Sequence, residues 1–207
     1  DRSGGVGNGF IYSYWTLAYS VCNGQFTRST NGGNSFETCR NIAGVPNWGS
    51  MAVGPDGELY IAGDGFIVCK SVNAKIAGQN PTFTYANVNL GGTIIYGQDP
   101  GPNPGGLLGQ AWVDVDRTSG SHHGWVYLLS SVHSGSNPCD IRFARSTNGG
   151  LTWSSASTIN KDGNIGAWHW FGALSVAPNG RIDVTWNDTR NHPGSYLSQV
   201  FYSYSED

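Results

Sequence analysis

Charged side chains are scarce in this sequence: only 12% of its 207 residues are Asp, Glu, Lys or Arg, and the formal net charge is −3. So small a negative charge offers no basic surface to a nucleic acid backbone. No apolar run is long enough to span a bilayer. No window shows the sustained 3.6-residue apolar spacing of an amphipathic helix. We therefore expect neither a nucleic-acid-binding protein, nor a membrane span, nor a helical fold.

Glycine is abundant instead, with 31 residues, and the aromatic side chains include 8 Trp and 10 Tyr. Short runs of alternating apolar and polar residues are separated by Gly, Pro, Asn and Asp, which is typical of β-strands joined by tight turns. The aromatic side chains supply surface that a core can bury, so the low charge does not indicate disorder. The sequence predicts a single all-β domain of ordinary size.

One octet occurs twice. Residues 146–153 read Ser-Thr-Asn-Gly-Gly-Leu-Thr-Trp, and residues 29–36 read Ser-Thr-Asn-Gly-Gly-Asn-Ser-Phe. Because Asn and Gly accept positive φ, each octet predicts a tight hairpin turn. A weaker third copy begins at Ser71-Val72-Asn73. Residues 48–61 also match residues 171–184, so a unit of about 115 to 123 residues occurs nearly twice.

The octet resembles the Asp-box, or BNR repeat, Ser-x-Asp-x-Gly-x-x-Trp, of sialidase-like β-propellers. The matching residues are Ser29, Asn31, Gly33 and Phe36 in the first copy and Ser146, Asn148, Gly150 and Trp153 in the second. Asn replaces the Asp in both copies, and Phe36 replaces the Trp in the first. In this family the box holds the turn between the third and fourth strands of a four-stranded blade. The resemblance therefore implies a structural role for these residues, away from the ligand site.

The resemblance predicts that residues 1–207 form one partial propeller of about four blades. The predicted blades are residues 1–45, 46–90, 107–162 and 166–207, with residues 91–106 as an inter-blade loop. The first blade lacks its inner strand and the last lacks its outer strand, whereas sialidase-like propellers have six blades. We therefore expect that the chain is a fragment, completed by missing blades or by another chain.

The sequence contains four cysteines: Cys22, Cys39, Cys69 and Cys139. Cys22 and Cys39 lie almost symmetrically about the first octet turn, which favours a disulfide between facing strands, the alternative being two buried free thiols. Cys69 and Cys139 could pair only through a long-range contact. Residues 187–189 form a glycosylation sequon. The chain begins Asp-Arg-Ser without a signal peptide, so we expect a mature or excised piece of an extracellular, secreted protein.

In propellers, ligands bind at one mouth of the central channel, where the inner strands begin and the second strands end. The predicted ligand-binding residues are Trp48, Trp112, His133, His169, Trp170 and Arg190. The candidates for catalysis are Asp64, Asp114, Asp188 and Arg190. Trp faces stack on sugars while polar groups bond their hydroxyls. As alternatives, Trp48 and Trp112 pack between blades, His169 is a satisfied core residue, and Asp188 pairs with Arg190 at the surface.

The residue set of a sialidase is not assembled in this sequence. The resemblance implies three Arg that clamp a carboxylate, a Tyr nucleophile activated by a Glu, and an Asp acid. Among the Arg residues, only Arg190 falls at a predicted mouth position. The Arg-Ile-Pro signature of the family is absent, because Arg181-Ile182 precedes Asp183. None of the three glutamates is well placed either, so no catalytic residue can be carried over, and whether the protein is an enzyme stays open.

We expect no organic cofactor, and no His/Cys cluster suggests zinc. Asp114 and Asp116 could hold Ca²⁺ together with backbone carbonyls, although their spacing matches no defined loop. Two hypotheses of function remain. We favour an extracellular propeller that binds a carbohydrate, a cell-surface glycoconjugate or another surface partner without catalysis, because the structural repeats are intact. The alternative is an exo-acting, sialidase-like glycoside hydrolase of which this chain is one part.

Overall fold

The computed structural model describes residues 1–207 except for 97–100, 104–105, 107–108, 164–165 and 207. The described strands are β1 (Ile11–Tyr14), β2 (Phe26–Ser29), β3 (Met51–Val53), β4 (Leu59–Gly63), β5 (Ile67–Ser71), β6 (Thr84–Asn87), β7 (Thr93–Ile94), β8 (Trp112–Val115), β9 (Val126–Ser134), β10 (Asn137–Ser146), β11 (Ser157–Thr158), β12 (His169–Val176), β13 (Ile182–Asp188) and β14 (Gln199–Ser205). Two short 3₁₀ turns are η1 (Leu17–Tyr19) and η2 (Asp64–Phe66). Among the described residues, no helix has the length and hydrophobicity needed to cross a membrane.

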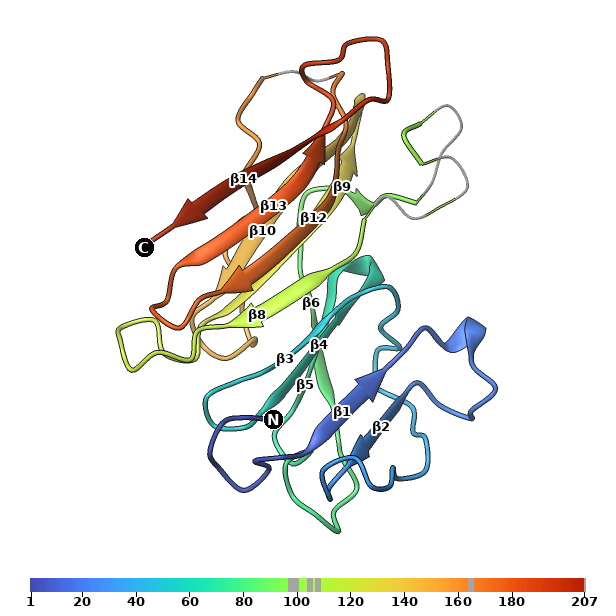
Figure 1. Ribbon diagram of the computed structural model, residues 1–207, viewed down its shortest axis with the longest axis vertical. Helices are drawn as coiled ribbons and strands as arrows, with labels where there is room; N and C mark the ends of the chain where they lie inside the picture. The colour runs from blue at the N-terminus through green and yellow to red at the C-terminus, as the bar shows by residue number, and fades with distance from the viewer. Residues whose placement is uncertain (97–100, 104–105, 107–108, 164–165, 207) are drawn as a thin grey trace.

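These strands form four antiparallel sheets in the described part of the chain. The first sheet pairs β1 with β2, and the second has the order β3-β4-β5-β6. The third has the order β11-β10-β9-β7, with β8 also paired to β9, and the fourth has the order β12-β13-β14. Figure 1 shows the sheets one after another along the molecule, from the first sheet below to the fourth above.

The segment that was predicted to be an inter-blade loop, residues 91–106, contributes a strand where it is described. In β7, Thr93 pairs with His133 and Ile94 pairs with Val132 of β9. Gly92 permits this approach, because a Cβ there would lie 2.1 Å from the carbonyl oxygen of His133. Residues 97–100 and 104–105 of the predicted loop lie outside the described residues. The third sheet therefore gains a short fifth strand beside β9.

Alternating burial along the strands explains how the sheets pack face to face. In β13, Ile182, Val184 and Trp186 are buried while the residues between them are more exposed, apart from the buried Asp188 at its end. These three join Tyr127 and Leu129 in a cluster between the third and fourth sheets. A second cluster joins the second and third sheets, and a third joins the first and second. Each pair of neighbouring sheets thus shares an apolar layer, which is the main source of stability in such a stack.

Consecutive sheets also meet through backbone near their inner strands. Gly49 forms an isolated parallel bridge with Ala111, and Cys139 forms one with Trp168. The backbone of Ser50 donates a hydrogen bond of 2.9 Å to the carbonyl of Ala111. Gly49 is needed at this point, since a Cβ would lie 2.1 Å from the carbonyl oxygen of Ala62. These contacts align the starts of the inner strands at one end of the molecule.

Both octets form the same hydrogen-bonded turn. Ser146 Oγ accepts a bond of 2.8 Å from the Gly150 N–H, and Asn148 Oδ1 accepts one of 2.9 Å from the Thr152 N–H. The first copy repeats this, with 2.9 Å from Gly33 N–H to Ser29 Oγ. The two Gly residues at the corner of each octet have positive φ, between 67° and 94°. Asn thus accepts the backbone bonds that an Asp at this position would accept.

The weaker third copy forms a similar turn, although its sequence is interrupted. Ser71 Oγ donates to Asn73 Oδ1 over 3.1 Å and accepts a bond of 3.0 Å from the Ala74 N–H. The Thr82 N–H then donates to Asn73 Oδ1 over 2.9 Å, so a residue beyond the insertion replaces the one that the octet lacks. The insertion therefore leaves the corner of the second sheet intact.

The structure contains a disulfide between Cys22 and Cys39, whose Cα atoms are 6.2 Å apart. Neither cysteine lies in a strand, contrary to the prediction of facing strands, because Cys22 precedes β2 and the chain after the first octet contacts β2 through an isolated bridge between Phe26 and Arg40 and a bond from the Glu37 N–H to the Arg28 carbonyl. Cys69 and Cys139 are both free and buried. Burial raises the pKa of each of these thiols to about 12, so both are protonated at neutral pH.

Candidate functional site

Most of the site residues predicted from the sequence lie at one end of the sheets, which we call the loop end. Here β3, β8 and β12 begin, and β4, β9 and β13 end. In Figure 1 the loop end faces the upper right: β12 begins there and runs down to the left, and the connections after β9 and β13 lie at the top. The octet turns follow the ends of β2, β5 and β10 and lie at the opposite end.

Trp48 and Asp64 meet at the loop end of the second sheet through a residue that sequence reasoning missed. The ring of Tyr96 packs edge-on against Trp48, with centroids 5.0 Å apart, and its hydroxyl donates a bond of 3.3 Å to Asp64 Oδ2. Asp64 Oδ1 accepts a bond of 3.2 Å from the Asn47 N–H. Burial and the Asp64 carboxylate raise the pKa of Tyr96 to about 12. Trp48 itself has a positive φ of 44°, which is uncommon for a bulky residue.

A second group of predicted residues meets where the third sheet packs on the fourth. In the register of β12 and β13, His169 lies opposite Asp188. His169 Nε2 is 3.2 Å from Asp162 Oδ2 and 3.5 Å from Asp188 Oδ2, while Nδ1 is 2.8 Å from the Cys139 carbonyl oxygen. The side chains of His169 and Asp188 are fully buried, and that of Asp162 is 7% exposed. We call Asp162, His169 and Asp188 the His169 cluster.

Sequence reasoning missed Asp162, which lies seven residues before His169 on the connection that follows the third sheet. Only the pairing of consecutive sheets brings this connection to β12, so no short motif could have indicated it. Asn160 fixes its position, since Asn160 Nδ2 is 2.9 Å from Asp140 Oδ1 and 3.3 Å from Asp162 Oδ1. One ligand atom each from Asp162, His169 and Asp188 lies within 4.8 Å of the other two, so the His169 cluster could hold a metal ion.

Arg190 and Asp188 do pair with one another, but not at the surface, because the carboxylate is inaccessible to solvent. Arg190 Nε donates to Asp188 Oδ2 over 2.8 Å, and Trp186 Nε1 donates to the same oxygen over 2.9 Å. Burial acts to raise the pKa of Asp188, but the hydrogen bonds from Arg190 and Trp186 outweigh it and hold that pKa below its usual value. The guanidinium also stacks on Phe201, with 4.3 Å from Cζ to the ring centroid. Arg190 thus has its closest contacts within the fourth sheet, and its Nε lies 3.8 Å from Asp162 Oδ2.

An open groove lies beside the His169 cluster at the surface. It is lined on one side by residues 166–168 and on the other by Thr189 and residues 192–196. Trp168 and Tyr196, one from each side, pack edge to face at nearly right angles, 82°, with ring centroids 6.5 Å apart. The Trp168 N–H bonds to Thr189 Oγ1 over 2.9 Å, which ties the two walls together. The sequence did not single out this aromatic pair as a ligand site, although Trp168 directly precedes the predicted His169.

The other predicted ligand-binding residues, Trp112, Trp170 and His133, are not part of the His169 cluster, and each has different contacts. Trp112 packs on the apolar cluster between the third and fourth sheets, in line with the alternative of inter-blade packing. Trp170 packs with Ile95 and Cys139. His133 lies in the β9–β10 hairpin, with Nδ1 3.0 Å from the Pro138 carbonyl oxygen.

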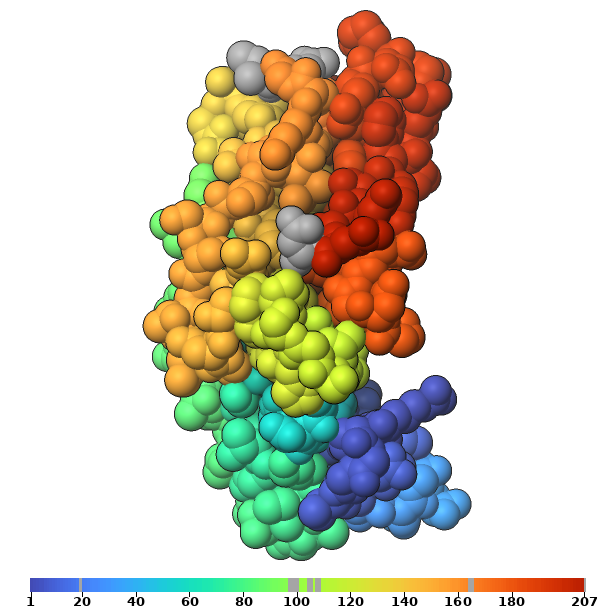
Figure 2. Space-filling model, turned by 90° about the vertical axis from the view of Figure 1, so that its left-hand side faces the viewer, coloured from blue at the N-terminus to red at the C-terminus, as the bar shows by residue number. Residues whose placement is uncertain are grey.

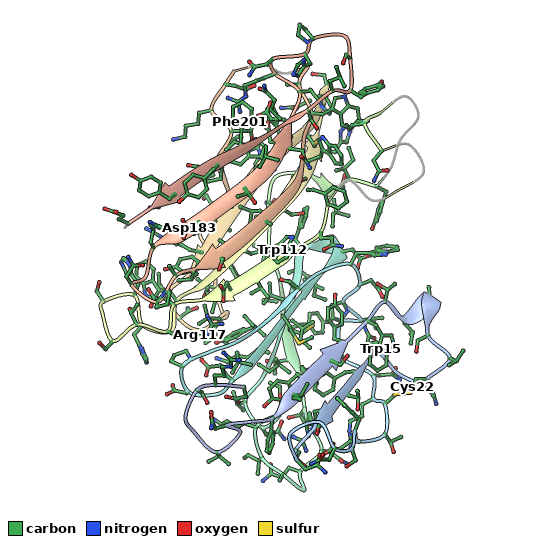
Figure 3. All side chains as sticks on the ribbon, in the orientation of Figure 1. Trp15, Cys22, Trp112, Arg117, Asp183 and Phe201 are labelled. Atoms are coloured by element: carbon green, nitrogen blue, oxygen red, sulfur yellow. A yellow bond between two sulfur atoms is a disulfide. The ribbon has the colours of Figure 1, made fainter. Side chains whose placement is uncertain are left out.

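Asp114 lies at the end of the sheets opposite the loop end. Its Oδ1 accepts a bond of 2.8 Å from Arg117 Nη2, and its Oδ2 accepts one of 2.8 Å from the Val176 N–H at the end of β12. Figure 3 shows Arg117 on the other side of the molecule from Trp15 and Cys22, and Figure 2 shows the loop that follows Asp116 filling the space among the neighbouring sheets there. The structure therefore does not bring Asp114 together with Asp64 or Asp188.

The possible Ca²⁺ ligands Asp114 and Asp116 are both engaged with the protein itself. Asp116 Oδ1 accepts a bond of 2.7 Å from the Thr118 N–H, in a turn that also joins the Gly124 N–H to the Asp116 carbonyl over 2.9 Å. Only 1% of Asp116 is exposed. These contacts are those of a turn that holds its own backbone.

No protein-family model and no curated protein matches this chain. Solved structures resemble it. An α-L-arabinanase of Penicillium chrysogenum, in complex with arabinobiose, is similar with a TM-score of 0.54 and 13% identity over 88% of this chain and 54% of that chain. An α-L-arabinofuranosidase of Fusarium graminearum gives 0.52 and 16% over 88% and 54%, and a leech intramolecular trans-sialidase gives 0.52 and 15% over 99% and 30%.

These likenesses show the fold, which is a sialidase-like β-propeller of the kind found in glycoside hydrolases. The four sheets are its blades, of which the first and last are incomplete in the described residues, as the sequence predicted. The chain spans about half the length of the arabinanase and the arabinofuranosidase that it matches. Identities this low carry no information about substrate or activity.

Proposed function

We propose that this chain is part of an extracellular β-propeller that binds carbohydrate at its loop end and that the chain itself supplies no catalytic residues. The observation that carries the proposal is the groove that Trp168 and Tyr196 line together with residues from both of its walls. Trp168 and Tyr196 pack edge to face on one another, and the groove that they line also contains Thr189, His192 and Ser195, so it offers both aromatic surface and hydrogen-bonding groups. Sugars are recognised by this combination of aromatic stacking and polar contacts.

The state of the carboxylates supports binding rather than catalysis. Asp188 is ionised, buried and hydrogen-bonded by Arg190 and Trp186, so it has no proton to donate to a leaving group. Asp64 is occupied by Tyr96 and by the backbone of Asn47. Asp162 and Asp188 lie close to one another, but both contact His169, which leaves no room between them for a sugar ring.

An extracellular location is supported by the disulfide between Cys22 and Cys39, because such bonds persist in oxidising compartments. We assign the blades to residues 1–45, 46–90, 107–162 and 166–207, and the third sheet also takes up β7 from the segment before residue 107. In the described residues the first blade has two strands and the last has three, and the structures that resemble it are longer. We infer that further blades, from the same protein or another chain, close the propeller.

Binding can be tested directly with a glycan array and with isothermal titration of arabino-oligosaccharides and sialyllactose. The expected result is saturable binding that Trp168→Ala and Tyr196→Ala each weaken by at least about tenfold, equal to about 1.4 kcal/mol. Tyr85→Ala is the matched control, since Tyr85 is 53% exposed, close to the 46% of Tyr196, but lies on the outer strand β6. Binding that all three variants retain would contradict the location of the site.

The hydrolase alternative has a separate outcome in the same samples. Aryl arabinosides and an aryl sialoside report turnover, and we expect none above background. Turnover that Asp188→Ala or Arg190→Ala abolishes in a variant that still unfolds cooperatively would replace the binding proposal with an exo-acting glycoside hydrolase.

A further inference from the structure

The tautomer of His169 is fixed by one backbone contact. Nδ1 lies 2.8 Å from the Cys139 carbonyl oxygen, and a carbonyl only accepts, so Nδ1 carries the hydrogen. In a neutral imidazole, Nε2 then carries no hydrogen and presents a lone pair. That lone pair faces Asp162 Oδ2 at 3.2 Å and Asp188 Oδ2 at 3.5 Å. Three electron-rich atoms thus converge in a fully buried place, an arrangement that requires a positive charge among them.

The carboxylates around His169 outnumber the guanidiniums that pair with them by one. Three carboxylates, Asp140, Asp162 and Asp188, are joined there through Asn160 and His169. Two guanidiniums balance two of them, with Arg142 bonded to Asp140 and Arg190 bonded to Asp188. Asp162 has no such full partner, since the nearest guanidinium contact, from Arg190 Nε, is 3.8 Å. Either a proton on His169 or a metal ion can supply the missing charge.

We propose that Asp162, His169 and Asp188 bind one divalent metal ion of the Zn²⁺ type. Around a tetrahedral Zn²⁺ with bonds of 2.0–2.2 Å, neighbouring ligand atoms are about 3.4 Å apart. The separations of 3.2 Å and 3.5 Å from Nε2 to the two carboxylate oxygens match that value, and the two oxygens lie within 4.8 Å of one another. A proton on Nε2 serves one carboxylate at a time, whereas an ion contacts both. Ca²⁺ is less suitable, because it prefers six to eight oxygen ligands and the cluster offers an imidazole nitrogen.

The residues behind the three ligands have the arrangement that metal sites use. Metal-binding histidines donate their second N–H to a carbonyl or carboxylate, and His169 donates to the Cys139 carbonyl. Trp186 Nε1 orients Asp188, and Asn160 Nδ2 contacts Asp162 at 3.3 Å. The fourth position of the ion belongs to water, on the side where Asp162 is slightly exposed. Asp188 Oδ2 also accepts hydrogen bonds from Arg190 Nε and Nη2, and binding of the ion requires the guanidinium to release this oxygen. This displacement lowers the affinity, so we expect a site that a strong chelator can empty.

The position of the ion connects two blades and the groove. Asp162 lies on the connection that follows the third sheet, whereas His169 and Asp188 belong to the fourth. Trp168 precedes His169 and Thr189 follows Asp188, so an ion on the cluster holds both walls of the groove from behind. This last consequence rests on the proposed function, but the metal site does not.

The experiment uses the full chain, purified without chelator and then treated with dipicolinate. We expect about one Zn²⁺ per chain by mass spectrometry of metals before treatment and none after it. Adding Zn²⁺ back at about 100 times its Kd raises Tm by about 5–10 °C, with Mn²⁺ and Ca²⁺ as comparisons. Co²⁺ in place of Zn²⁺ gives a visible absorption band of a tetrahedral site. Asp162→Asn and His169→Gln both abolish stoichiometric binding, whereas Asp183→Asn, a matched carboxylate on β13 paired with Arg181, retains it.

The wild-type protein alone can overturn the proposal. If none of the four ions binds it or raises its Tm, the cluster is a pair of a protonated histidine with Asp162, and the metal site is wrong. Stoichiometric Zn²⁺ that Asp162→Asn retains contradicts the assignment of the ligands. Because His169→Gln could fail to fold, the Asp162 variant and the Co²⁺ band decide the question. Zn²⁺ binding without any glycan binding would support the metal site and reject the proposed function, so the two failures are distinguishable.

Discussion

Lys70 Nζ donates a hydrogen bond of 3.0 Å to the carbonyl oxygen of Gly149, which ties the second blade to the octet turn of the third. The same ammonium lies 5.2 Å from the ring centroid of Tyr60, whose hydroxyl also approaches this carbonyl at 3.4 Å. Gly149 has a φ of 67° and exposes its carbonyl toward the neighbouring blade. The turn is therefore a point of contact between blades as well as a corner within one.

We predict that Lys70→Met destabilises the protein by about 1 kcal/mol, because it keeps the aliphatic stem but removes the bond to Gly149. Urea unfolding measures the change. Lys161→Met, at an exposed position, is the control and is expected to change stability by less than about 0.5 kcal/mol. A Lys70 variant as stable as the wild type would show that this bond does not contribute to the joining of the blades.

The octet turns make different predictions for their Ser and Asn residues. Ser146→Ala leaves the Gly150 N–H without its partner in a position where Ser146 is only 1% exposed, so we expect a loss of about 1–3 kcal/mol. Asn148→Asp keeps the oxygen that accepts from the Thr152 N–H, and the Thr152 hydroxyl can turn to donate to the new oxygen. We expect that variant to lie within about 0.5 kcal/mol of the wild type.

Both octet variants are compared by chemical unfolding, with Ser29→Ala as the matched substitution in the first copy. Its hydroxyl accepts from the Gly33 N–H in the same way, so a similar loss is expected. Equal effects of the Ser and Asn substitutions would be inconsistent with this account of the turn.

Removal of the disulfide is expected to weaken the first blade. The bond closes a loop with a sequence separation of 17, and the chain-entropy model gives about 3 kcal/mol for a loop of this size. We predict that Cys22→Ser with Cys39→Ser lowers the free energy of unfolding by about 2–4 kcal/mol. Unfolding with and without reductant measures this change in stability, and the double variant should no longer respond to reductant.

Cys69 and Cys139, being buried, should react with a thiol reagent only after unfolding.

Replacement of Tyr127 by Phe is expected to keep or raise the stability of the protein. Its side chain is 1% exposed, and its hydroxyl is buried without a hydrogen-bond partner among the described residues. Tyr127→Phe removes that unpaired group and is expected to be neutral or to stabilise by up to about 1 kcal/mol at pH 7. Loss of stability in this variant would indicate that the hydroxyl has a partner, such as water.

Tyr127 also predicts a dependence on alkaline pH. Burial, followed by the nearby Asp116 carboxylate, raises the pKa of Tyr127 to about 12, above the value near 10 of an unfolded chain. Between these values the folded protein holds more protons than the unfolded one, so stability falls as pH rises from 10 to 12. The contribution is fully present below pH 10. The decrease measured by urea unfolding should be smaller in Tyr127→Phe than in the wild type.

The sequence by itself determined the all-β fold and the octet corners. It could do so because these features are local: Asn and Gly specify the tight corner wherever they occur together, and alternating burial in a strand such as β13 depends on neighbours two residues apart. The resemblance of the repeated octet to the Asp-box then implied a propeller and its incomplete first and last blades.

The tertiary structure alone decided which side chains meet. His169 and Asp188 come together through the register of β12 with β13, and Asp162 reaches them only because consecutive blades pack face to face. Asp114 looked equivalent to Asp188 in the sequence, yet it lies at the opposite end of the sheets and bonds to Arg117 and Val176. Tyr96 and Tyr196 joined Trp48 and Trp168 in the same way, by contacts between segments far apart in the chain. Such contacts depend on strand register and on packing between segments far apart in the chain, which no local pattern of residues encodes.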